Sequence, residues 1–356
     1  MRPRRILYGV VGEGMGHATR SQVVAAHLEA QGHHVKLVAS GRAHAYLAAR
    51  FADVVEIRGL TLHYRHGAMD RDVSLLKNVA LAPSMLLANV EAYLSEVRDY
   101  RPDLVFSDFE SWSWAFAKRF GLPIVSLDNQ QIIHKCKHDR DVWEGAEADY
   151  RATRAFVKAK LPGCDHYVVT SFFAPKVREK WQGRVTIVPP ILRREILDAR
   201  PTRGDHVLVY QTSTSDDTLL DALATLTGER FVVYGLRRDE QRGHVVLKGF
   251  REAEFVADLA SAKAVVTNAG LSLIHEAIYL GKPLFCVPVA HQFEQDMNAR
   301  YVEKYGYGLT VPRMDAGALG AFLGELPKFE AALARHVQQG NEAAFAVVDG
   351  LVEALS

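Results

Sequence analysis

Short, continuously apolar segments recur along this chain and alternate with segments that have helical periodicity. The apolar segments are RILYGVV (5–11), HHVKLVAS (33–40), RPDLVFSD (101–108), LPIVSL (122–127), DHYVVTS (165–171), HVLVYQTS (206–213), RFVVYGL (230–236), AKAVVTN (262–268) and KPLFCVPV (282–289). Strands that are apolar on both faces are typical of a parallel sheet covered by helices on both sides. The alternation therefore predicts an α/β fold.

The length and one compositional break predict two domains. The chain has 356 residues, which is more than one typical hydrophobic core supports. Pro189, Pro190, Pro201 and Gly204 lie among charged residues, and a new apolar strand follows them. We expect a first domain at 1–190, a linker at 191–205, a second domain at 206–335, and a helix at 336–356 that packs back on the first domain.

Two segments share one internal pattern. Residues 101–127 and 262–288 each contain a strand, a polar loop, a helix, a Gly-x-Pro turn and a second strand. Each segment matches a late unit of a doubly wound parallel sheet, so the two domains are predicted to be related in fold. Ligands of such sheets bind at the carboxyl ends of the strands, which places a binding cleft between the domains.

The charge distribution excludes a polyelectrolyte partner and allows an anionic one. The net charge is +1, and no basic tract indicates nucleic-acid binding. Residues 1–190 carry 26 basic and 20 acidic side chains, whereas residues 191–356 carry 17 and 22. The basic excess favours an anionic ligand or membrane surface, or is simply a solvated face.

Cysteine usage and hydropathy predict a cytoplasmic protein. The three cysteines are far apart and form no CxxC motif, which fits a reducing compartment. No stretch approaches the roughly 18 apolar residues that would span a bilayer, so we expect peripheral membrane contact at most.

The loop GEGMGH (12–17) follows the first strand and resembles a dinucleotide-binding loop only in part. A nicotinamide site needs a third glycine where this chain has His17, and an acidic residue where the second strand ends in Ala39-Ser40. The loop fails both tests. Gly14 and Gly16 still allow a ligand to approach the backbone closely.

His17 is predicted to begin a helix at the edge of the cleft. A helix N-terminus disfavours a positively charged imidazole, so His17 is suited to act as a neutral general base. The alternative is that His17 merely caps the helix.

The GEGxGHxxR start and the run at 265–311 resemble glycosyltransferases of the GT-B fold, of the family 28 and family 1 types, which include the peptidoglycan-building N-acetylglucosaminyltransferases. The resemblance covers roughly residues 5–315 and is strongest in the second half. It implies two Rossmann-like domains that face a central cleft. It also implies transfer of a sugar from a nucleotide donor, UDP in most relatives, in cell-envelope or glycoconjugate biosynthesis.

The resemblance assigns donor-binding roles to several residues. Asn268, Gly270, Leu271 and Ser272 form the loop whose backbone N–H groups face the diphosphate, and Glu276 takes the ribose hydroxyls. His291, Gln292, Glu294 and Gln295 are the residues that read the sugar, although the relatives have a Gln-Gln pair at 294–295. Ser213 and Thr214 are the phosphate hydroxyls, with Gly14 and Gly16 nearby. Phe250 holds the nucleobase, or is an ordinary aromatic of the core or surface.

The catalytic group implied by the resemblance is His17 as base, with Asp108 orienting its imidazole. The alternative role of Asp108 is to cap the helix that begins near Ser111, and Glu110 competes for the orienting role. The resemblance further implies inversion at the anomeric carbon. Backbone N–H groups at 268–272 would stabilise the leaving diphosphate, so no metal or other cofactor is expected. The pairs Asp70/Asp72 and Asp139/Asp141 are interpreted as solvated charges rather than metal ligands.

The acceptor is expected against the first domain. Residues 60–86 and 129–161 hold aromatic, histidine and basic side chains, which favour a lipid-linked or phosphate-bearing acceptor. Two alternatives stay open. One is a sugar-nucleotide hydrolase or epimerase, in which His17 activates water, and the other is a non-catalytic nucleotide-sugar-binding protein.

Overall fold

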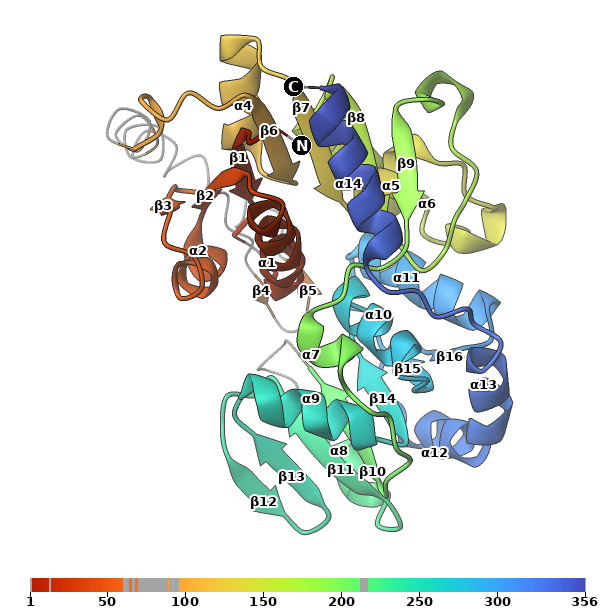
Figure 1. Ribbon diagram of the computed structural model, residues 1–356. Helices are drawn as coiled ribbons and strands as arrows, with labels where there is room; N and C mark the ends of the chain where they lie inside the picture. Colours follow the sequence, from red (N-terminus) through yellow and green to blue (C-terminus); the bar gives the residue numbers. More distant parts are fainter. Residues whose placement is uncertain are drawn as a thin grey trace.

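The structure is a computed structural model that describes residues 2–12, 14–59, 64–65, 68–69, 89, 92, 96–211 and 217–355. Each half of the chain contains a parallel sheet with helices on both of its faces, and the two sheets lie one above the other in Figure 1. The predicted α/β architecture with two doubly wound sheets is confirmed.

The first sheet has the strand order β3-β2-β1-β6-β7-β8-β9, and every neighbouring pair is parallel. The strands are β1 (Arg5–Val10), β2 (His34–Ala39), β3 (Val54–Glu56), β6 (Leu104–Asp108), β7 (Ile124–Asp128), β8 (His166–Thr170) and β9 (Val185–Val188). The order reverses direction at the β1–β6 pair, which is where ligands of such sheets bind.

Helices cover this sheet on both sides (Figure 1). They are α1 (Met15–Ala30), α2 (Gly41–Ala48), α4 (Ser111–Phe120), α5 (Gln131–Lys135) and α6 (Glu147–Lys160). The short elements of this half are β4 (Tyr64–Arg65), β5 (Ala68–Met69), η2 (Arg140–Val142) and η3 (Glu179–Trp181).

The second sheet has the order β12-β13-β11-β10-β14-β15-β16 and is parallel except for the β12–β13 pair. Its strands are β10 (His206–Tyr210), β11 (Arg230–Tyr234), β12 (Glu240–Arg242), β13 (Val245–Lys248), β14 (Ala264–Thr267), β15 (Leu284–Cys286) and β16 (Gly308–Thr310). Its helices are α8 (Asp217–Thr225), α9 (Glu252–Ser261), α10 (Leu271–Tyr279), α11 (Phe293–Lys304), α12 (Ala316–Gly324) and α13 (Leu326–Leu333). The repeated sequence pattern corresponds to β6-α4-β7 in the first sheet and β14-α10-β15 in the second.

The chain crosses between the domains twice. The first crossing contains the short helix α7 (Arg194–Leu197), and the second leads to α14 (Glu342–Ala354), which packs against α1, β8 and β9 (Figure 1). Ala344, Val348 and Val352 are buried in the core of the first domain. The rings of His27 and Phe345 stack with centroids 3.9 Å apart.

One side of the domain interface is closed by packing around α11. Phe173 stacks on Tyr301 at 3.7 Å, and Arg300 donates to the carbonyl oxygens of Asp141 and Glu144. Lys304 pairs with both Asp139 and Asp141, so these two carboxylates serve as interdomain ion pairs. The other predicted pair, Asp70/Asp72, lies outside the described residues.

Candidate active site

The structure brings His17 and Asp108 together at the β1–β6 switch point. Val10 at the end of β1 pairs in register with Asp108 at the end of β6. Gly14, with φ of 86°, turns the chain into α1, and a positive φ there favours glycine. His17 lies in the first turn of α1, and its Nδ1 lies 2.7 Å from Asp108 Oδ1.

Glu110, and not Asp108, caps the neighbouring helix. Its carboxylate accepts hydrogen bonds from the backbone N–H groups of Trp112 and Ser113, both at 2.6 Å. The two competing interpretations of this segment therefore apply to different residues. Asp108 is free of the capping role and faces His17.

Arg20 and Ser21 complete the surroundings of Asp108. Arg20 donates to both carboxylate oxygens, at 3.0 and 2.6 Å, and Ser21 Oγ donates at 2.9 Å. Asp108 is fully buried. Burial opposes its ionisation, but the charge of Arg20 and the hydrogen bonds from Arg20 and His17 outweigh burial and hold the pKa of Asp108 below its usual range. Asp108 is therefore a carboxylate at neutral pH.

A polar loop after β7 connects this group to the second domain. Asn129 accepts from Arg20 at 3.1 Å and donates to Glu294 Oε1 at 2.6 Å. Gln130 Nε2 lies 3.2 Å from His17 Nε2 and 3.2 Å from Glu294 Oε2. The sequence patterns assigned no individual role to Asn129 or Gln130. The signal that would have found them is a run of polar side chains directly after a buried strand, next to the strand that carries Asp108.

These contacts define the tautomer of His17. A carboxylate can only accept, so the Gln130 atom that faces Glu294 is the amide nitrogen. The same nitrogen faces His17 Nε2, which must then be the accepting, unprotonated nitrogen. The ring proton then lies on Nδ1 and is donated to Asp108 at 2.7 Å, the shorter of two contacts at this nitrogen; the other is with Arg20 Nη2 at 3.1 Å, which can only donate. A general base needs this arrangement, with its free lone pair on Nε2.

A second buried carboxyl lies beside this group. Asp128 ends β7, accepts from Ser126 Oγ at 2.6 Å, and caps α5 by accepting from the backbone N–H of Gln131. Burial raises the pKa of Asp128 to about 6, since these hydrogen bonds only partly offset desolvation. The charge of Arg20 acts on Asp128 as well, but more weakly than on Asp108, so the two carboxyl groups differ in acidity.

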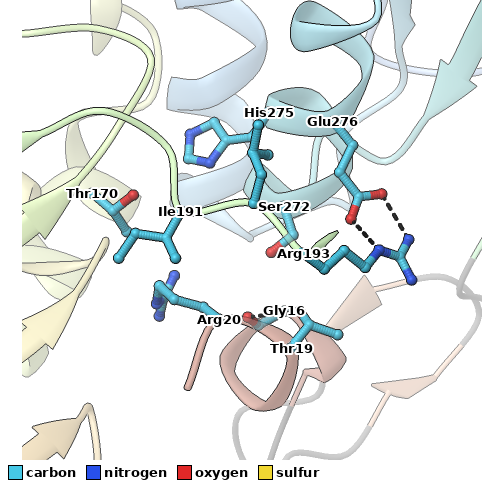
Figure 2. A pocket seen from close by; sticks show the side chains of 10 residues that line it. Gly16, Thr19, Arg20, Thr170, Ile191, Arg193, Ser272, His275 and Glu276 are labelled. Carbon is cyan, nitrogen blue, oxygen red and sulfur yellow. Dashed lines mark hydrogen bonds and ion pairs between the residues drawn. The ribbon is translucent and has the colours of Figure 1, made fainter. Parts of the chain in front are cut away.

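The predicted diphosphate site lies where α10 of the second domain meets α1 of the first. Asn268 and Gly270 precede α10, Leu271 begins it, and Ser272 follows within its first turn. The first N–H groups of a helix lack intrahelical acceptors, so they are available to an anion. Figure 2 shows Gly16 against Ser272, and a Cβ atom at Gly16 would lie 2.2 Å from Ser272 Oγ. The cavity here has a volume of about 10 Å³, room for roughly one water molecule.

Glu276, the predicted ribose ligand, is paired with Arg193 from the linker. Two guanidinium nitrogens bind its two oxygens at 2.8 and 2.9 Å (Figure 2). Arg193 also donates to Glu252 at 2.9 Å, and Arg50 of the first domain donates to the same carboxylate at 2.8 Å. A chain of ion pairs therefore crosses the cleft. Burial raises the pKa of Glu276, against the opposing effect of Arg193.

The four residues predicted to read the sugar point in different directions. Glu294 faces Asn129 and Gln130, whereas Gln295 accepts from the backbone N–H of Val289. His291, which contacts Asp149 of α6 at 3.3 Å, and Gln292 line a separate cavity of about 620 Å³ between the domains. Of these contacts, those of Glu294 reach Asn129 and Gln130 beside His17.

The remaining predicted donor residues have different outcomes. Phe250 is 56 % exposed, and its ring packs against Phe255 at 5.3 Å, so one face is open to a ligand. Ser213 and Thr214 lie outside the described residues. Within the described part of the chain, no group of three or more His, Cys, Asp and Glu side chains is placed so that it could hold a metal ion.

The fold and the site define a GT-B enzyme of sugar transfer, and comparison with known proteins agrees. The model of the family "Glycosyl transferase family 1" matches residues 4–327. The chain belongs to this family and is a glycosyltransferase.

Relatives and solved structures support the assignment over most of the chain. An uncharacterized glycosyltransferase of Methanosarcina acetivorans is 25% identical over 334 residues, covering 85% of this chain and 84% of that protein. A UDP-N-acetylglucosamine–N-acetylmuramyl-(pentapeptide) pyrophosphoryl-undecaprenol N-acetylglucosamine transferase of Bacillus thuringiensis is 23% identical, over 43% of this chain and 49% of its own length.

Two solved structures cover the whole of this chain and are themselves covered completely. They are the glycotransferase of kitacinnamycin, with a TM-score of 0.72 and 18% identity, and CalG4, the calicheamicin glycosyltransferase, with 0.70 and 19%. These likenesses show the GT-B fold. Across the described residues, no helix is long and apolar enough to cross a membrane.

Proposed function

We propose that the protein transfers a sugar from a UDP-activated donor to an acceptor hydroxyl, with inversion and without a metal ion or other cofactor. The observation that carries this proposal is the contact of His17 Nδ1 with Asp108 at 2.7 Å, which leaves Nε2 as the basic nitrogen. His17 would take the proton of the acceptor hydroxyl as its oxygen attacks the anomeric carbon and the nucleoside diphosphate leaves. Asp108 would orient the ring and stabilise the imidazolium.

The donor half of the site would stabilise the leaving group. The backbone N–H groups from Asn268 to Ser272 are suited to the developing charge on the diphosphate, as donors at a helix N-terminus. Glu276 would accept from the ribose hydroxyls, Phe250 would contact the base, and Glu294 would accept from a sugar hydroxyl. The small volume between Gly16 and Ser272 requires the domains to separate before the nucleotide enters.

We further propose a lipid-linked or otherwise anionic acceptor for a cytoplasmic enzyme that contacts the membrane peripherally. Helix α6 carries the exposed Lys158 in its last turn, and Phe156 beside it is 50 % exposed. An exposed aromatic ring next to a cation suits an anionic lipid surface. Sedimentation with anionic vesicles tests this, and binding that is absent or insensitive to salt would count against it.

The enzymatic test begins with the donor. Unfolding temperature is measured with UDP, UDP-N-acetylglucosamine and other nucleotide sugars, because a ligand at about 100 times its Kd stabilises the fold by about 2.7 kcal/mol. The stabilising donor is then incubated with a pyrophosphoryl-polyprenol-linked sugar as acceptor, with and without EDTA. Product with the opposite anomeric configuration, formed equally in EDTA, is expected.

A parallel incubation without acceptor identifies the competing chemistry. Rapid release of free sugar and UDP in that sample would overturn transfer in favour of hydrolysis. Unchanged turnover by the His17→Ala variant would overturn the assignment of the base.

A further inference from the structure

We propose that Gln130 is a positioning residue that occupies the basic nitrogen of His17 until a donor sugar engages Glu294. The inference rests on the proposed function and adds a coupling between the two halves of the site. It makes the general base available only when a sugar is in place. The established family membership assigns no such role to this side chain.

The amide nitrogen of Gln130 donates hydrogen bonds in two directions. Its amide nitrogen carries two protons, and two acceptors lie within reach, His17 Nε2 and Glu294 Oε2, each at 3.2 Å. Both protons are therefore used. The lone pair that would accept the proton of a substrate hydroxyl is occupied by the amide.

Glu294 links this contact to the donor. Its two oxygens are held by amides of the first domain, Oε1 by Asn129 and Oε2 by Gln130. A sugar hydroxyl that donates to Oε2 competes directly with Gln130. Glu294 belongs to α11 of the second domain, so the competition transmits occupancy of the donor site to the first domain.

Gln130 also has an unused side-chain oxygen. Its Oε1 is buried and has no hydrogen-bond partner among the described residues. A buried acceptor without a partner is destabilising. Rotation of the amide away from His17, toward a hydroxyl that can donate to Oε1, relieves this destabilisation, and a sugar brings such hydroxyls. In the free protein, Gln130 therefore keeps its contact with His17 Nε2, and the hydroxyls of a bound sugar favour its rotation away from that nitrogen.

The consequence is an order of events in which the basic nitrogen of His17 becomes accessible after the donor sugar has bound. While the donor site is empty, no water or acceptor can reach the lone pair of His17 Nε2 without displacing Gln130. Once the sugar binds, Gln130 turns, and Nε2 faces the acceptor.

The test uses the full-length protein with ¹⁵N-labelled histidine, and His17→Ala assigns the resonance. In the wild type, UDP-N-acetylglucosamine and the other sugar nucleotides of the panel should move the Nε2 resonance of His17, whereas UDP alone should not. In Gln130→Ala the free protein should already differ from the wild type, and the sugar nucleotide should add little. Gln241→Ala, an exposed glutamine on the edge strand β12, is the matched control and should behave as the wild type.

Two results would overturn the proposal. One is an equal response of the wild type to UDP and to the sugar nucleotide. The other is a His17 resonance in free Gln130→Ala identical to that of the wild type. If no sugar nucleotide of the panel binds, the proposed donor is wrong, yet the free-protein comparison still decides the Gln130–His17 contact.

Discussion

The two sides of the cleft differ in how complete they are without substrates. Around His17, the side chains from α1 and β6 already pair with one another, whereas Oε1 of Gln130 in the loop after β7 has no partner among the described residues. On the donor side, Arg193 occupies Glu276, and Gly16 touches Ser272. The contacts between His17, Arg20 and Asp108 lie within the first domain, whereas the shape of the donor side depends on the relative position of the two domains. Substrate binding must therefore rearrange the donor side, whereas on the catalytic side the proposed change is confined to Gln130.

Replacement of His17 by Ala removes the proposed basic nitrogen, Nε2, from the preorganised side of the cleft. Loss of a general base typically lowers kcat by 10²–10⁴-fold, and we expect about 10³, or about 4 kcal/mol. Nucleotide affinity, measured by calorimetry, should stay at the wild-type value because no donor contact is removed. Residual transfer within about tenfold of the wild type would mean that another group is the base.

Replacement of Arg20 by Met tests whether the preorganisation lies in the Asp108 ion pair. Arg20 donates twice to the fully buried carboxylate. Removing one partner of a buried pair typically costs about 3–5 kcal/mol, so the free energy of unfolding in urea should fall by about 3 kcal/mol or more. The double variant Arg20→Met/Asp108→Asn should lose clearly less than the two single variants combined. Strict additivity would show that the pair is not coupled.

The pH dependence of the unfolding free energy tests the raised pKa of Asp128 on the catalytic side. Its pKa is raised from 3.8 to about 6 in the folded protein, so the folded state binds the proton more tightly than the unfolded state. Its contribution to stability is therefore fully present below about pH 4 and is lost as the pH rises through about 6. From pH 4 to 7, the unfolding free energy of the wild type should fall by up to about 3 kcal/mol relative to Asp128→Asn. A difference that is constant across this range would contradict the raised pKa.

Arg193 provides the corresponding test of the donor side. If its pairing with Glu276 keeps ribose out, Arg193→Met should tighten UDP binding by about tenfold, the equivalent of one charge-assisted hydrogen bond. Calorimetric titration with UDP measures the effect, and Arg194→Met, which removes an exposed pair with Asp198, is the control. Weaker binding in Arg193→Met would show that Arg193 instead holds Glu276 in position for the ribose.

The features that could be predicted from the sequence are those that a short, continuous stretch of residues determines. The long apolar strands predicted both sheets. His17 was predicted from the glycine loop after the first strand, and Asp108 from the family resemblance and its place at the end of a strand. The strands β3, β9, β12, β13 and β16 escaped because each lies at or next to the edge of its sheet and is only partly buried, so a long continuous apolar run is absent.

The parts that could not be predicted depend on pairing across the cleft. Arg193 lies in the linker, and nothing near it in the sequence points to Glu276, which is 83 residues away. Gln130 and Asn129 were included only in a long segment expected to line the acceptor. Their contacts with Glu294 join residues about 165 positions apart, and only the relative placement of the two domains creates them.

Helix α14 has a consequence for how the protein is made. Its apolar face covers part of α1, β8 and β9, yet residues 342–354 leave the ribosome only after the whole second domain. During translation, the apolar surface of α1, β8 and β9 that α14 covers therefore stays exposed while the second domain is synthesised and folds. Such surface on a nascent chain is prone to aggregation and is the kind that chaperones hold. The domain that emerges first is thus the one whose core is completed last.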